Sequence, residues 1–164
     1  MSSAAVRIVA ASEHDVPLIL EMIRALADYE KLAHEVEASE ERLRETLFGK
    51  QPAAEVSLAY VGDVCAGFAV YFPTYSTFLA LPGMYLEDLY VRPEHRGQGI
   101  GFALLRHLAA LCRERGYGRL EWSVLNWNEP SIQFYKRLGA APLEEWTRYR
   151  LAGDSLRALG EEIG

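Results

Sequence analysis

The segment of residues 84–101, MYLEDLYVRPEHRGQGIG, constrains the fold of this chain more than any other stretch. Its first eight residues form a largely apolar run, which predicts a central β-strand covered on both faces. A short turn follows, and glycines then open a helix with apolar residues at helical spacing. A strand that leads into a glycine-rich helix N-terminus presents bare backbone N–H groups, which bind phosphate. The segment therefore predicts an α/β or α+β fold with an anion site where the strand meets the helix.

Two carboxylates, Glu87 and Asp88, lie inside this predicted strand. Alternation places Glu87 on one face and Asp88 on the other, and both faces are otherwise apolar. We therefore expect both carboxylates to be buried, and burial raises a carboxyl pKa toward values useful for proton transfer. The alternative is structural, with one acid paired to an arginine and the other accepting from a loop N–H. The adjacent glycine turn favours a functional role for a carboxylate of this strand over the structural one.

The glycine motif, residues 96–101, limits the kind of phosphate ligand that the turn can hold. No Lys-Ser/Thr pair follows its last glycine, so it is not a Walker loop, and it lacks the dinucleotide pattern G-x-G-x-x-G. Nucleoside triphosphate and nicotinamide chemistry are therefore disfavoured. The alternative is a tight turn in which the glycines only permit close packing.

The rest of the sequence predicts further helices and strands around this junction. Helices are expected from Ser12 to about Glu30, from Ser39 to a C-terminal stop at Gly49, from the glycine turn to Gly116, and from Glu129 to Leu138. Strands are expected at residues 6–10, 56–61, 64–72, 84–91, 120–125 and 146–151. Residues 73–83 are expected to form a loop, and the tail from Asp154 a helical turn. No repeat or linker interrupts the pattern, which predicts one domain over residues 1–164.

Composition excludes several classes of partner. The net charge is −6, whereas nucleic-acid binding needs a basic surface. No segment approaches the roughly 20 apolar residues that cross a bilayer, and the start of the chain lacks the pattern of a secretion signal. Cys65 and Cys112 lie in apolar runs, and the four histidines show no metal-ligand spacing. The sequence thus predicts a cytoplasmic protein with no metal, no nucleic-acid partner and no membrane partner.

Several motifs together resemble the GNAT acetyltransferases. The pieces LEDLYV, RGQGIG, WNEPSIQFYKRLGA and ALADYEKL are similar in particular to the diamine N-acetyltransferases, of the spermidine/spermine and thialysine types. The resemblance covers roughly residues 5 to 155. It implies a mixed, mostly antiparallel central sheet flanked by helices, in the order β-α-α-β-β-β-α-β-α-β. It also implies acetyl-CoA as the co-substrate and a homodimer.

The resemblance assigns roles to particular positions of this sequence. The cofactor-binding positions are the strand end and the glycine turn, with an asparagine downstream: Leu89, Tyr90, Val91, Arg96, Gly97, Gln98, Gly99, Ile100, Gly101, Phe102 and Asn128. The substrate-binding positions are Tyr29, Glu30, Glu87, and Glu144 or Glu145. The catalytic positions are Glu87, as the base that receives the amine's proton directly or through water, and Tyr135, which faces the thioester sulfur.

These positions predict N-acetylation of a small diamine, polyamine or lysine analogue by direct attack in a ternary complex. An alkyl ammonium of pKa about 10.4 is neutral only about once in ~2,500 molecules at pH 7, so a base is needed. No cysteine or serine is paired with a base in the motif region, so no acyl-enzyme is expected. Two alternatives remain: the same chemistry on a peptide or protein amine, and a non-catalytic module that only binds acyl-CoA.

Overall fold

The computed structural model describes residues 5–161, so the ends of the predicted domain, residues 1–4 and 162–164, lie outside the described residues. The chain forms two compact units, residues 1–125 and residues 126–164. The first unit contains the elements β1 (Val6–Ala10), α1 (Val16–Tyr29), α2 (Glu40–Phe48), β2 (Glu55–Val61), β3 (Val64–Ser76), β4 (Leu81–Val91), α3 (Ile100–Arg115) and β5 (Leu120–Trp122). The second contains α4 (Glu129–Arg137) and α5 (Gly153–Glu161).

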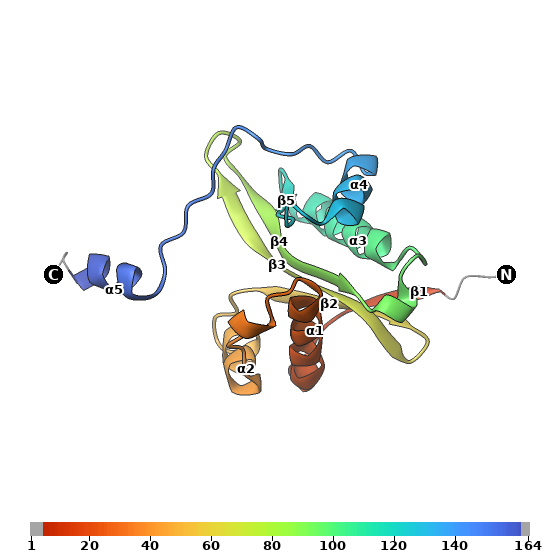
Figure 1. The fold of residues 1–164 in the computed structure, drawn as a ribbon. Coiled ribbons are helices and arrows are strands. Elements are labelled where there is room, and N and C mark those ends of the chain that lie inside the picture. The colour runs from red at the N-terminus through yellow and green to blue at the C-terminus, as the bar shows by residue number, and fades with distance from the viewer. Residues whose placement is uncertain (1–4, 162–164) are drawn as a thin grey trace. The chain divides into compact units, whose positions relative to one another are not determined.

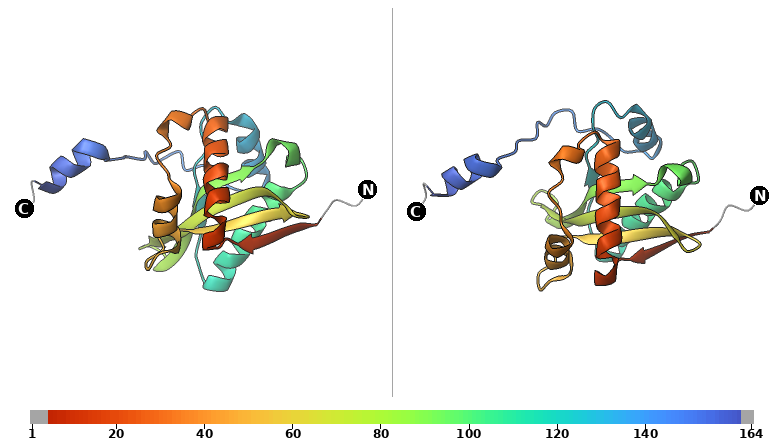
Figure 2. Two further views of the ribbon diagram at one scale, coloured as in Figure 1. Left: turned by 90° about the horizontal axis from the view of Figure 1, so that it is seen from below. Right: turned by 60° about the horizontal axis from the view of Figure 1, so that its bottom comes forward.

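A five-stranded sheet in the order β1-β2-β3-β4-β5 forms the centre of the first unit. Strands β1 to β4 pair antiparallel, and β5 pairs parallel to β4 after the crossover through α3. Figure 1 shows α1 and α2 on one face of the sheet and α3 on the other, and both views of Figure 2 agree for α1 and α2. This mixed, mostly antiparallel sheet flanked by helices confirms the predicted fold class.

Each face of the sheet buries the apolar stripe of a helix. On one face, Ile19 and Met22 of α1 pack with Leu43 of α2 against Leu58 and Phe68. On the other face, Leu104 and Leu108 of α3 are fully buried. Leu104, Leu108 and Cys112 follow the predicted helical spacing, and Cys112 lies with its sulfur 3.9 Å from that of Met84 on β4. The sheet is thus a rigid support whose central strand, β4, is covered on both sides.

The helix ends follow local capping chemistry. Ser39 begins α2 and accepts a hydrogen bond from the Arg42 backbone N–H at 3.2 Å, which satisfies one free donor of the first turn. Gly49 ends α2 as predicted, but in an extended conformation rather than the left-handed one typical of a C-terminal glycine. A Cβ at this position would come within 2.3 Å of the Glu45 carbonyl oxygen. Glycine is therefore required here because the position lies close to the Glu45 carbonyl, and not because its φ is positive.

The predicted loop at residues 73–83 is wrong, because β3 and β4 continue through most of it as a long hairpin. Pro73 pairs with Met84 inside this hairpin. The last pair between β2 and β3 is Glu55 with Tyr71, so β3 is an edge strand from Phe72 onward. A proline is compatible with an edge strand because no neighbour needs its missing N–H.

The tip of the hairpin contains Ala80 at φ 53°, a left-handed conformation that strains residues with a Cβ. Ala80→Gly should therefore raise the free energy of unfolding by about 0.5–1 kcal/mol, measured by urea denaturation. The matched control is Ala109→Gly, an exposed position inside α3, which should lower it by about 1 kcal/mol. Equal effects of the two substitutions would contradict this account of the tip.

Two strand predictions near the C-terminus also differ from the structure. The strand expected at residues 120–125 is limited to Leu120–Trp122. Residues 146–151, expected to form a last strand, have no regular secondary structure and are exposed. Their alternating pattern is that of a strand, but a strand forms only beside another strand, and the sheet β1-β2-β3-β4-β5 does not include this segment. The predicted helix at Glu129–Leu138 and the C-terminal helical turn are confirmed as α4 and α5.

Candidate active site

The glycine turn between β4 and α3 has the geometry of an anion site. Gly97 and Gly99 have φ values of 76° and 79°, which favour glycine. A Cβ at either position would meet no atom of residues 5–161 within 4 Å, so the turn opens onto free space. The first backbone bond of α3 runs from the Ala103 N–H to the Gly99 carbonyl at 2.9 Å. The helix therefore leaves the N–H groups of residues 100–102 unused, at the positive end of its dipole.

The predicted cofactor-binding residues of the first unit gather at this turn. Ile100 is buried and anchors the start of α3, whereas Gln98 and Phe102 are exposed beside it. Arg96 donates from Nε to the Val91 carbonyl at 3.0 Å, which ties the turn to the end of β4. The turn and the strand end are thus one connected structure, as the sequence motif requires.

The strand edge next to the turn is open within the first unit. β4 pairs with β5 only from Met84 to Leu86, whereas its pairing with β3 continues to Val91. Among residues 5–125, no strand covers the other edge of residues 87–91. An unpaired edge offers backbone donors and acceptors to an extended ligand. The edge contains Leu89, Tyr90 and Val91, three of the positions that the sequence predicts to bind a cofactor.

An extra residue in β4 overturns the predicted burial of one of the two acids, Glu87. Tyr71 pairs with Leu86 and Val70 with Asp88, so Glu87 is the unpaired residue of a β-bulge. Glu87 is exposed, and the expectation that it is buried is wrong. The bulge also reverses the alternation of side chains along the strand. As a result, Asp88 shares the face of Val70, which packs against the core under α1 and α2.

The Asp88 carboxyl has the electrostatic environment that was expected of Glu87. Burial raises its pKa from 3.8 to about 7, and the nearby Glu87 and Glu30 carboxylates add smaller contributions. Burial also raises the pKa of the Glu30 carboxyl, which lies at the C-terminal end of α1. Three acids from two separate segments thus form one negatively charged cluster. Such a cluster attracts a cation and can accept its proton near neutral pH.

A stack of one arginine on two tyrosines connects this acid cluster with the glycine turn. The Arg96 guanidinium lies 4.8 Å from the centre of the Tyr29 ring and 5.6 Å from that of Tyr90. Tyr29 precedes Glu30 at the end of α1, and Tyr90 is buried on β4. These distances are typical of cation–π contacts. Sequence spacing does not predict this stack, because its three members come from separate segments that only the fold brings together.

The second unit holds the other predicted site residues. Asn128 is buried and begins α4, where its side chain accepts from the Ser131 N–H at 3.4 Å. Tyr135 lies on the same helix, with its ring centre 5.6 Å from that of Phe134. Glu144 and Glu145 are both exposed in a turn. The predicted roles of all four residues toward cofactor or substrate stay predictions.

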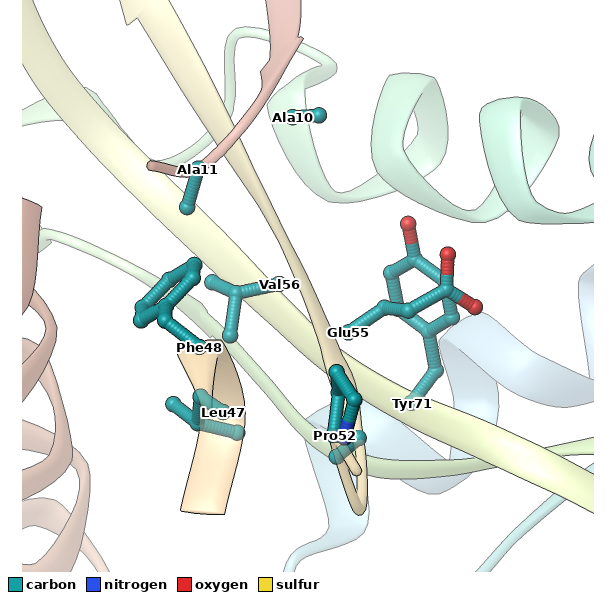
Figure 3. Close-up of a pocket in the computed structure, with 9 residues that line it drawn as sticks. Ala10, Ala11, Leu47, Phe48, Pro52, Glu55, Val56 and Tyr71 are labelled. Atoms are coloured by element: carbon teal, nitrogen blue, oxygen red, sulfur yellow. The ribbon is translucent and has the colours of Figure 1, made fainter. Parts of the chain in front are cut away.

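Figure 3 shows a pocket at another part of the first unit. It has a volume of about 190 Å³ and is lined by the end of α2 and the adjoining ends of β1 and β2, with Leu47, Phe48 and Val56 among its walls. None of the predicted site residues lines it. Glu55, at its margin, forms a bidentate ion pair with Arg115, in which the two guanidinium Nη atoms lie 2.7 and 2.8 Å from the carboxylate oxygens. The pocket is therefore separate from the glycine turn and the acid cluster.

Two further features bear on the class of site. Among residues 5–161, no group of three histidine, cysteine or acidic side chains could hold a metal ion. In the same range, no helix is long and apolar enough to cross a bilayer.

Comparison with known proteins gives consistent matches over most of the chain. The model of the acetyltransferase (GNAT) family matches residues 20–140. The chain is 39% identical over 167 residues to a thialysine N-epsilon-acetyltransferase of Sus scrofa, covering 95% of this chain and 98% of that enzyme. It is 32% identical over 198 residues to the L-ornithine N5-acetyltransferase NATA1 of Arabidopsis thaliana, covering 93% and 87%. Among solved structures, an integron cassette protein from the mobile metagenome of V. cholerae superposes with a TM-score of 0.80 at 29% identity, covering 98% of this chain and 99% of that one.

Proposed function

The chain belongs to the GNAT acetyltransferase family and is an N-acetyltransferase; from this premise we propose that it acetylates the primary amine of a small cationic substrate with acetyl-CoA, by direct attack in a ternary complex. One observation carries the proposal. An open glycine turn and strand edge lie in the same unit as an acid cluster in which Asp88 has a pKa of about 7. The first can hold a phosphate-bearing acyl donor, and the second can receive a protonated amine.

The residues of the turn fit the proposed co-substrate. The N–H groups of residues 97–102 would bind its diphosphate, and the edge of β4 would hydrogen-bond its extended arm. Bound there, acetyl-CoA would supply an activated acyl group as a thioester. Asn128 and Tyr135 remain predicted contacts from the second unit, with Tyr135 as the proton donor to the departing sulfur.

The acid cluster addresses the main barrier to the reaction. At pH 7 the ionised state of a Lys-like amine, with a pKa of about 10.4, adds about 4–5 kcal/mol before any attack. We propose that exposed Glu87 and half-buried Glu30 hold the ammonium group, and that Asp88 accepts its proton, directly or through water. A carboxyl of pKa about 7 is half ionised at neutral pH, so it can both accept and release this proton. Glu87, the base predicted from the sequence, is the rival for this role.

The substrate class follows from the charge of the cluster and from the relatives. The enzymes of Sus scrofa and Arabidopsis thaliana are named for thialysine and L-ornithine, two amino acids with a distal primary amine. Three carboxylates near one site favour a substrate of more than one positive charge. Glu144 or Glu145 is the predicted further contact for such a substrate.

Release of CoA thiol tests the proposal. With acetyl-CoA, the purified chain should release CoA in the presence of thialysine, ornithine or spermidine, and kcat/KM should be higher for these than for lysine-containing peptides. A higher value for peptides would favour the alternative of a peptide or protein amine. No release with any of these amines, despite acetyl-CoA binding by calorimetry, would show a non-catalytic acyl-CoA-binding module.

We also propose that the chain is a cytoplasmic homodimer. In the second unit Leu143, Trp146 and Tyr149 are exposed, with Tyr149 at 92%, and large apolar side chains gathered in one segment are typical of an interaction surface. The two thiols, Cys65 and Cys112, are buried and free, which suits a reducing compartment. Light scattering after size-exclusion chromatography should give twice the chain mass of 18.4 kDa. A mass of one chain at micromolar concentration would contradict the dimer.

A further inference from the structure

Arg96 occupies a position that joins the two halves of the proposed site. Its Nε donates to the Val91 carbonyl, and its guanidinium lies over the rings of Tyr29 and Tyr90. One contact therefore fixes it to the strand edge, and the other two fix it between α1 and β4. Since Arg96 is also the first residue of the glycine turn, any ligand held by the turn lies close to this side chain.

The other nitrogens of the guanidinium remain available to a ligand. Within residues 5–161, Nη1 and Nη2 of Arg96 have no hydrogen-bond partner. A phosphate on the turn can accept from these nitrogens while Nε stays on Val91 and the planar group stays on the rings. Arginine suits this arrangement because its donors lie in one plane and its faces remain free to stack.

The end of α1 links the position of Tyr29 to that of Glu30 in the acid cluster. Glu30 follows Tyr29 directly, and Lys31 has the left-handed φ of 62° that ends the helix. The Lys31 N–H donates to the Asp28 carbonyl at 3.1 Å, and the Leu32 N–H donates to the Ala27 carbonyl at 2.8 Å. These bonds fix the backbone on both sides of Glu30. A restraint on the Tyr29 ring therefore also restrains the carboxylate beside it.

We propose that Arg96 is a positioning residue that couples the two subsites, so that cofactor bound at the glycine turn orders the end of α1 and strengthens binding of the amine. The inference rests on the proposed function, because it needs an anion at the turn and a cation at the acid cluster. The coupling is positive. The phosphate holds the Arg96 guanidinium in the position in which it stacks on Tyr29. Binding of the amine then no longer includes the entropic cost of ordering Tyr29 and Glu30.

Amide hydrogen exchange tests the coupling without knowledge of the natural amine. CoA should slow exchange in the last turn of α1, residues 26–30, by at least about fivefold in the unaltered chain. Tyr29→Leu removes the ring and should abolish this protection, whereas Tyr29→Phe keeps the ring and should retain it. The matched control is Tyr60→Leu, which removes the ring under Arg7 at 4.9 Å, a similar stack on the β1–β2 pair. That variant should retain the protection.

Calorimetry gives the reciprocal measurement. Saturating CoA should lower the Kd of thialysine at least about fivefold, and saturating thialysine should lower the Kd of CoA by the same factor. Tyr29→Leu should bring both ratios close to one, whatever it does to either affinity alone. If CoA binds but leaves exchange at residues 26–30 unchanged, or if Tyr29→Leu keeps the protection, the coupling is wrong and the proposed function stands. If CoA does not bind at all, both fail.

Discussion

Replacing Asp88 with asparagine should lower kcat/KM for the amine by about 10²–10⁴-fold, the usual contribution of a general base. With a pKa of about 7 for Asp88, the ionised, proton-accepting form increases with pH through neutrality. The activity of the unaltered chain should therefore rise between pH 6 and pH 8. In Asp88→Asn this rise should move to higher pH, where the free amine forms without help. Initial rates of CoA release across pH 5.5–9.5 measure both effects.

The matched control is Glu87→Gln, on the neighbouring residue of the same bulge. If Glu87 only holds the cation, this variant should mainly raise KM for the amine and leave the pH at which activity rises unchanged. If Glu87→Gln instead lowers kcat and moves the pH profile upward while Asp88→Asn does not, Glu87 is the base, as predicted from the sequence. The two carboxylates are thus distinguished by one pair of variants.

The same Asp88→Asn substitution should stabilise the fold at high pH. The folded-state pKa of Asp88, about 7, lies above its ordinary value of 3.8. Its contribution to stability is therefore fully present below about pH 4 and is lost as pH rises through 7. At pH 8 the buried charge of Asp88 opposes folding. Removing this charge should raise the free energy of unfolding by about 2 kcal/mol, which is roughly half of the free energy that the full pKa shift represents. At pH 4 the gain should vanish, which urea denaturation at both pH values can check.

Gly99→Ala should weaken acetyl-CoA binding by about 10–100-fold, because hydrogen bonds to a charged group contribute about 1.5–3 kcal/mol. Gly99 is left-handed, and a Cβ there would project into the free space that the proposed diphosphate occupies. An alanine either fills this space or leaves the left-handed region, and both outcomes disturb the N–H groups of the turn. Isothermal titration with acetyl-CoA measures the loss.

Gly116→Ala, at the other end of α3, is the control for backbone strain. Gly116 has a φ of 70°, and a Cβ there would likewise meet no atom of the described part of the chain within 4 Å. Both substitutions should lower the free energy of unfolding by about 1–2 kcal/mol, but only Gly99→Ala should weaken cofactor binding. Equal cofactor affinity in the two variants would contradict the placement of the phosphate at the glycine turn.

Much of the fold could be predicted because local patterns agree with the tertiary structure. The apolar stripes of α1 and α3 have helical spacing, and the strands expected at residues 56–61 and 64–72 pair as β2 and β3 across the two residues Gly62 and Asp63. The hairpin at residues 73–83 could not be predicted, because proline and glycine predict a loop unless the strand is known to lie at an edge. Whether this part of β3 lies at an edge depends on where β2 ends, and only the tertiary structure shows that.

The site was predicted in part for the same reason. The glycine turn is a local motif, and its open geometry matches the expectation from the sequence. The environments of Glu87 and Asp88 depend on one unpaired residue, which alternation cannot reveal. The Arg96 stack depends on three segments meeting, so no sequence spacing encodes it. The family match, in contrast, could be predicted from the motifs and is confirmed by the relatives.

The bulge at Glu87 also makes the pairing register between β3 and β4 part of the site. Residues 84 and 86 face α3, whereas residues 88 and 90 face α1, and only the extra residue allows both. An insertion of one residue on β3 between Val70 and Tyr71 would give Glu87 a partner, restore strict alternation and turn Asp88 and Tyr90 toward the face of residues 84 and 86. The glycine motif would remain letter for letter, yet Arg96 would lose a ring and Glu30 its neighbouring acid. Two sequences with identical motifs would then differ in catalysis through a single gap in their alignment.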